Sequence, residues 1–101
     1  MYLYNTTFVV TPAIKDKFIA WAKDQYIATA LDSGIFYSPI LSRILAEHEP
    51  GTVAYALQMR AKSVNEANAW HESAGDDMRK ICSMKWGDSF LHFSTFMQIV
   101  G

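Results

Sequence analysis

The chain has 101 residues, of which 50% are hydrophobic and 14% aromatic, so one small domain can bury a packed core without a metal or a disulfide. Nine basic and ten acidic residues give a formal net charge of −1, whereas a nucleic-acid binder needs a basic patch. We therefore expect a single domain over residues 1–101 and no nucleic-acid partner.

The single cysteine, Cys82, excludes an internal disulfide and a Cys-based structural zinc site. The N-terminal residues lack the basic region of a signal peptide, and no apolar run reaches the roughly 20 residues that a membrane helix needs. We expect a cytoplasmic protein with no membrane partner and no cofactor, in which Cys82 is a small buried hydrophobe.

The first elements are a strand and a helix. Residues 2–10, "YLYNTTFVV", have the Tyr, Thr, Phe and Val content that is typical of a strand. Thr11 and Pro12 then fit the N-cap and the first position of a helix. Apolar residues at spacings of three and four continue this helix, and a last turn ends it at Ser33-Gly34.

Two strands follow, over residues 35–46 and 52–60, joined by the turn "EHEPG" at residues 47–51. Pro39 cannot donate a ladder hydrogen bond, so the first of these strands is predicted at a sheet edge or with a bulge.

Residues 63–86 are predicted to be helical, because Ser63 and Glu66 form a capping box and an apolar stripe follows from Val64 to Cys82. We expect a break or kink at Gly75-Asp76, followed by a last strand over residues 89–100. The order β-α-β-β-α-β predicts an α+β, ferredoxin-like fold, with a four-stranded antiparallel sheet and both helices on one face.

The uncovered face of this sheet indicates a partner. Strand alternation places an apolar set there, worth on the order of 1.5–3 kcal/mol per large side chain when buried, and a second copy is the simplest cover. We therefore expect a homodimer through the open sheet face. The apolar set comprises Leu3, Val9, Leu41, Phe90 and Phe96.

The same face is predicted to gather polar residues that could line a cavity for a small-molecule ligand. These candidates are Asn5, Tyr37, Arg43, Gln58, Arg60 and His92. Alternatively, they only form hydrogen bonds across a dimer interface. The leading hypothesis is a non-enzymatic, small-molecule-binding or interaction module. The alternative is a small cofactor-independent monooxygenase or isomerase, for which a cavity lined by His92 and Arg43 would argue.

His71-Glu72 begins like the zinc-peptidase motif H-E-x-x-H. That motif needs a second His at position 75, where this chain has Gly75, so we expect no zinc there.

Five segments in this order resemble the bacterial domain-of-unknown-function family 4286: "YNTTFVV", "FIAWAKDQYIATALDSGIF", "LSRIL", "TVAYALQ" and "WGDSFLHFSTF". The resemblance implies a dimeric α+β barrel, in which two ferredoxin-like sheets face each other, and it implies no activity. Haem-degrading monooxygenases of the wider superfamily use an Asn on the first strand and a Trp and a His on the second helix. Asn5 and Trp70 match, but residues 78–81 hold no His, so the resemblance does not extend to a haem site.

Overall fold

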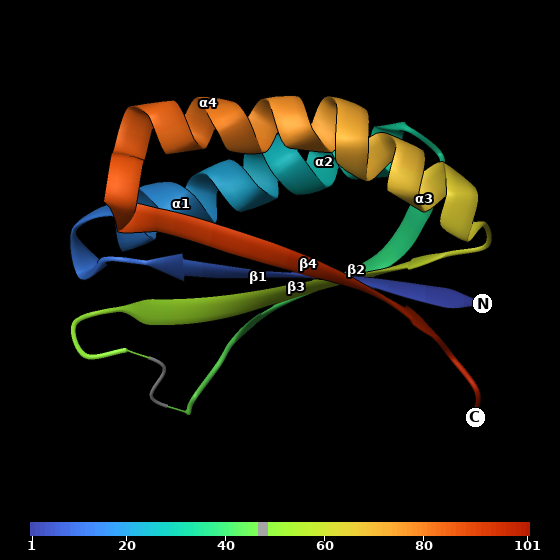
Figure 1. Cartoon of the computed structure of the whole chain (residues 1–101), viewed down its shortest axis with the longest axis horizontal. Helices are drawn as coiled ribbons and strands as arrows, with labels where there is room; N and C mark the ends of the chain where they lie inside the picture. The colour runs from blue at the N-terminus through green and yellow to red at the C-terminus, as the bar shows by residue number, and fades with distance from the viewer. Residues whose placement is uncertain (47–48) are drawn as a thin grey trace.

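The computed structural model describes residues 1–46 and 49–101. Its four strands form one antiparallel sheet in the order β2-β3-β1-β4. The helices all lie on one side of this sheet (Figure 1). The predicted ferredoxin-like order β-α-β-β-α-β is therefore confirmed. The strands are β1 (Tyr2–Val10), β2 (Phe36–Arg43), β3 (Val53–Ala61) and β4 (Phe90–Gln98). Glu47 and His48, in the predicted turn, lie outside the described residues.

Two long helical runs cover the sheet, and each contains a π-helical segment. The first run comprises η1 (Pro12–Ile14), α1 (Lys15–Trp21), η2 (Ala22–Ile27) and α2 (Ala28–Asp32). The second comprises α3 (Val64–Trp70), η3 (His71–Gly75) and α4 (Asp76–Trp86), and the short 3-10 turn η4 (Gly87–Ser89) leads from it into β4. The π-helical segments are η2 and η3. No helix of the described part of the chain combines the length and the hydropathy that crossing a membrane requires.

The predicted helix starts are correct in position but differ in how they are capped. Ser63 is the N-cap of α3, and its hydroxyl accepts a hydrogen bond from the backbone N–H of Glu66 at 3.2 Å. Thr11 precedes the first run, yet its side chain makes no capping bond there, and its buried hydroxyl has no hydrogen-bond partner among the described residues.

The predicted break at Gly75-Asp76 is a π-helical segment instead. Gly75 and Asp76 both keep right-handed helical backbone angles, so Asp76 does not cap a new helix. A π-turn inserts one extra residue into a helix and rotates everything beyond it. The inward positions therefore run from Trp70 to Gly75, five residues on, and then to Arg79 and Cys82.

The core between the helices and the sheet is rich in aromatic rings. Phe8 of β1 is fully buried, and its ring lies 5.0 Å from that of Phe18 on α1. Trp70 on α3 packs edge-on against Phe36 of β2 at 5.2 Å and against Tyr26 of η2 at 5.4 Å. Each such ring removes a large apolar area from water, so these contacts hold both helical runs to the sheet.

The edge position of the second strand is confirmed. β2 is one of the two edge strands, and its pairing with β3 shifts between Tyr37 and Ile40, where Ser38 adopts a φ of 52° next to Pro39. The shift inserts one extra residue on β2 and exchanges the faces of everything after it. Leu41 therefore pairs with Leu57 on the helix-covered face rather than on the open face as predicted.

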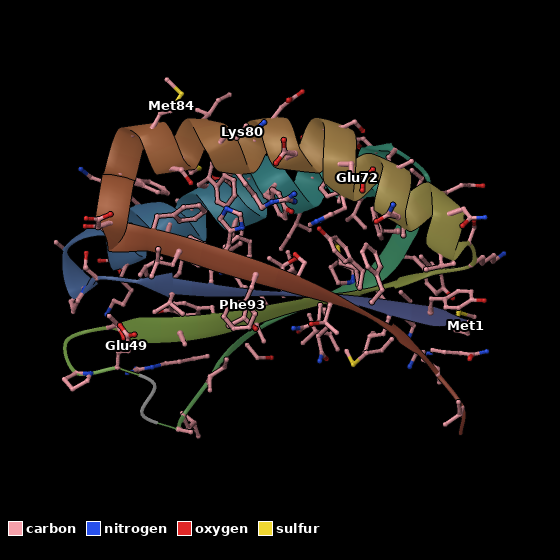
Figure 2. The ribbon with its side chains drawn as sticks, viewed as in Figure 1. Met1, Glu49, Glu72, Lys80, Met84 and Phe93 are labelled. Carbon is pink, nitrogen blue, oxygen red and sulfur yellow. The ribbon has the colours of Figure 1, made fainter. Side chains whose placement is uncertain are left out.

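The predicted faces of β4 are also wrong. Phe90 pairs with Val10 and Phe96 pairs with Tyr4, so both rings lie under the helices. Leu91, Phe93 and Met97 face the opposite side and are 51%, 52% and 38% exposed. Figure 2 shows the ring of Phe93 on the side of the sheet away from the helices. Both alternating sets of β4 contain large apolar residues, so alternation by itself did not distinguish its two faces.

Candidate functional site

The open face of the sheet carries an exposed apolar surface. The strand register places on this face Ile40 of β2, Leu3 of β1, and Leu91, Phe93 and Met97 of β4. Ile40 is 59% exposed. A hollow of about 400 Å³ opens on this face, within the size range of small-molecule sites. Its lining consists of Leu3, Ser38, Ile40, Gln58, Arg60 and Ile99.

The structure separates the six predicted cavity residues. Asn5, Tyr37, Gln58 and Arg60 share the open face, where Asn5 pairs with Gln58 and Tyr37 pairs with Arg60. Gln58 and Arg60 line the hollow. Tyr37 lines a separate depression of about 540 Å³ at the start of β2, and its hydroxyl contacts the sulfur of Met1.

His92 and Arg43 do not share that face, so this part of the prediction is wrong. His92 pairs with Phe8 on the helix-covered face, and its ring lies 5.6 Å from that of Phe90. Arg43 pairs with Tyr55, on the helix side of the β2 edge, and is exposed. The bulge in β2 moved Arg43, and the reversed faces of β4 moved His92.

A second polar cluster, which the sequence did not reveal, lies between the helices and the sheet. Its centre is Arg79 of α4, which is only 2% exposed. The Arg79 guanidinium donates to the Tyr26 hydroxyl at 2.6 Å, to the Tyr4 hydroxyl at 3.3 Å and to the backbone oxygen of His71 at 2.7 Å. The Tyr4 hydroxyl in turn lies 2.6 Å from Nδ1 of His71. We call Arg79, Tyr4, Tyr26 and His71 the arginine cluster.

The arginine cluster carries a buried positive charge that is poorly compensated. Nε of Arg79 has no hydrogen-bond partner among the described residues. The nearest carboxylate is that of Asp76, with an oxygen 4.0 Å from an Arg79 nitrogen, and its other oxygen is 2.9 Å from Lys80. Burial raises the pKa of Tyr26 far above its ordinary value, so its phenol stays neutral beside the guanidinium.

Two imidazoles flank this charge. Burial and the neighbouring Arg79 charge lower the pKa of His71, and the same two causes lower the pKa of His92. Both rings are therefore neutral at neutral pH, and neither can repel an anion. Among the described residues, no three His, Cys, Asp or Glu side chains gather where they could hold a metal ion. His71 contacts Tyr4 while Glu72 is exposed, and the expectation of no zinc there stays a prediction.

The arginine cluster could not be predicted from the helical pattern, because π-helical segments bring its members together. Tyr26 lies in η2, and His71 lies in η3, just before Arg79. Under a regular helical period, Ala74, Met78 and Ile81 continue the inward stripe; the inserted residue turns Gly75 and Arg79 inward, and leaves Ile81 65% exposed.

The fold is shared with solved structures of low sequence identity. HapK from Hahella chejuensis superposes with a TM-score of 0.70 at 14% identity, over 100% of this chain and 94% of HapK. A dimeric ferredoxin-like protein from an uncultured marine organism gives 0.68 at 11% identity, over 99% and 95% of the two chains. A monooxygenase from the gene ActVA-Orf6 of Streptomyces coelicolor, solved with nanaomycin D, gives 0.68 at 17% identity, over 99% and 88%.

No match was found among curated proteins. A family model described as "Domain of unknown function (DUF4286)" matches residues 1–100.

Proposed function

This chain belongs to the DUF4286 family, and on that premise we propose that it is a homodimeric binding domain, in which two copies pair through their open sheet faces around a small-molecule site. The single ferredoxin-like domain spans residues 1–101 in this proposal. A cytoplasmic location and the absence of a cofactor stay predictions from the sequence.

The exposed apolar surface of the open face carries the proposal. Leu91, Met97 and Ile40 leave 38–59% of their area in water on one face, and covering such side chains is worth about 1.5–3 kcal/mol each when burial is complete. A two-fold axis brings the same patch from both copies together, so each apolar residue is buried once in each copy and contributes twice to the interface. Two solved structures with this fold, described as dimeric ferredoxin-like proteins, support this arrangement.

The hollow on the open face is the proposed ligand site. Leu3, Ile40 and Ile99 provide apolar walls, while Gln58 and Arg60, which pair with Ile40 and Leu3, provide hydrogen-bond donors among them. A second copy facing this hollow would shield it from water and strengthen those polar contacts. The ligand that fits this lining has an apolar body and a hydrogen-bond acceptor. Asn5 lies beside this hollow, because it pairs with Gln58.

The geometry favours binding over catalysis on this face. Neither of the two histidines that the structure describes lies there, and a general base is the group that an oxygenase or isomerase would need most. The monooxygenase that shares the fold is only 17% identical, so it supports the architecture and not an activity.

Two methionines allow a matched test of the dimer. Met97 on β4 faces the open side and Met84 on α4 points away from the sheet on the outer side of the helices (Figure 2), 38% and 87% exposed. By light scattering at micromolar concentration, the unmodified protein should have twice the 11.4 kDa mass of one chain. Met97→Asp should give a folded monomer, because pairing would bury an unpaired carboxylate in each copy, and Met84→Asp should stay dimeric.

A monomeric mass for the unmodified protein would refute the proposed assembly. Dissociation by Met84→Asp, with Met97→Asp still dimeric, would place the interface on the helices instead.

A further inference from the structure

We infer that the arginine cluster is the floor of a second binding site, within each protomer, for a small molecule that carries a carboxylate. The site lies between α4 and β4 on the helix-covered face of the sheet. It does not depend on the proposed dimer, because one chain supplies all of its residues.

The first step is the unbalanced charge. A guanidinium carries a positive charge, and here the Arg79 side chain that holds it is 2% exposed. A guanidinium offers five N–H donors, and here three contacts of hydrogen-bond length occupy two of its nitrogens. All three acceptors are neutral, whereas buried charges in proteins are paired. An anion is therefore the group that this environment lacks.

The second step excludes the nearby side chains as that anion. The Asp76 carboxylate lies 4.0 Å away, beyond hydrogen-bond length, and bonds to Lys80 at 2.9 Å. Tyr26 remains a neutral phenol, because burial raises its pKa. A carboxylate is the preferred partner of a guanidinium, and the unpartnered Nε of Arg79 and the Nη2 nitrogen near Asp76 are the donors it would use. Because Nε is buried, the carboxylate reaches it only when side chains at the edge of the site move aside.

The third step is access from the β4 side. Tyr4, Phe8 and Leu57, on the two central strands, are each at most 1% exposed under the helices. On β4 the residues that face the same way, His92, Ser94 and Phe96, are all partly exposed. The helical layer therefore leaves the β4 edge incompletely covered, and His71 lies partly exposed in the layer above.

The groups at this edge define the rest of the ligand. The Phe96 ring stacks on Tyr4 at 4.8 Å and contacts His71 edge-on at 5.7 Å, so aromatic rings surround this edge. Ser94 bonds to Thr6 at 2.8 Å and adds a hydroxyl to the β4 side. A carboxylate attached to a flat apolar ring matches this combination of a buried cation and aromatic rings.

The test uses benzoate as the probe and benzamide as its neutral counterpart, on the full-length protein. Nuclear magnetic resonance detects the Nε–H proton of each arginine, and the exposed Arg43, which lies outside both proposed sites, serves as the internal control. Benzoate should shift the Arg79 signal in a saturable manner, while benzamide should leave that signal unchanged. The same response should persist in the monomeric Met97→Asp variant, so this site and the proposed dimer can fail separately.

Asp76→Asn provides a second, independent readout. Removing a carboxylate close to Arg79 should tighten benzoate binding by roughly threefold to tenfold, because two like charges no longer compete for one cation. Lys80→Gln, which changes the other member of the surface ion pair, should leave binding within about twofold, since that charge is solvent-exposed.

Three results would overturn the inference: no saturable shift of the Arg79 signal, an equal shift with benzamide, or weaker binding in Asp76→Asn. A response to inorganic phosphate without one to benzoate would also overturn it, because the site would then not be specific for carboxylates.

Discussion

Replacing Gly75 by alanine should destabilise this protein, although the same change usually stabilises a helix. Alanine in place of glycine in a helix interior gains about 0.8–1 kcal/mol. Gly75 has ordinary helical backbone angles, so alanine can adopt its conformation. The obstacle is space, because a Cβ built there would lie 2.7 Å from Cζ3 of Trp70 and 2.8 Å from Nη1 of Arg79.

The magnitude depends on how far those two neighbours can move. Trp70 is 5% exposed and packs between Tyr26 and Phe36, and the same Nη1 of Arg79 donates to Tyr26 at 2.6 Å. Inserting one carbon into such a site costs about 1–3 kcal/mol, and a weakened hydrogen bond from a charged group costs about 1.5–3 kcal/mol more. After the helical gain, we expect a net loss of about 1.5–5 kcal/mol.

Thermal unfolding followed by circular dichroism measures this loss. One kcal/mol moves the melting temperature of a domain of this size by about 4–8 °C, so Gly75→Ala should melt at least about 6 °C lower. Asn68→Ala, at an exposed position of the same helical run, is the matched control and should be neutral or slightly stabilising. A Gly75→Ala variant that melts at or above the unmodified protein would refute the close packing of Gly75.

Three further predictions follow from the helix-covered face. Phe96→Asp should unfold the protein rather than only dissociate a dimer, because the carboxylate would replace a ring stacked on Tyr4; circular dichroism of a folded monomer would contradict this. The free energy of unfolding should fall as the pH drops below about 6.5 and level off below the folded-state pKa values. The reason is that the pKa values of His71 and His92 are lowered in the folded protein, so the unfolded chain binds protons first. Urea denaturation between pH 7.5 and 5.5 measures this free energy, and a flat profile would be evidence against the prediction. Burial raises the pKa of Cys82 to about 11, so a thiol reagent at pH 8 should label it slowly in the native protein and quickly in urea, whereas fast native labelling would show an accessible thiolate.

The fold could be predicted because each element has a local signal. The strand composition of residues 2–10, the capping hydroxyl of Ser63 and the missing N–H of Pro39 act over a few residues, and the structure confirms all three placements. The membership of the DUF4286 family was likewise visible in segments spread over nearly the whole chain.

The sites were harder to predict because single-residue insertions exchange buried and exposed positions. One extra residue in β2 moved Leu41 and Arg43 to the other face, and one in η3 turned Arg79 into the core. A charged residue within a helix is usually solvated, so nothing local identified Arg79 as buried. In β4, polar His92 and Ser94 made their set look like the exposed one, although Thr6 gives Ser94 a partner inside.

The bulge at Ser38 and Pro39 also limits how the protein can polymerise. Uncapped sheet edges invite strand-by-strand growth into fibrils, and this sheet has edges at β2 and β4. If each molecule paired through both edges, a row of molecules could extend indefinitely. The irregular backbone at Ser38 and the missing N–H of Pro39 obstruct such pairing along β2. Growth through β4 alone stops at two chains, because one β4 edge can only meet another. Straightening β2, by replacing Pro39 and deleting the extra residue, should therefore make the protein prone to fibril formation.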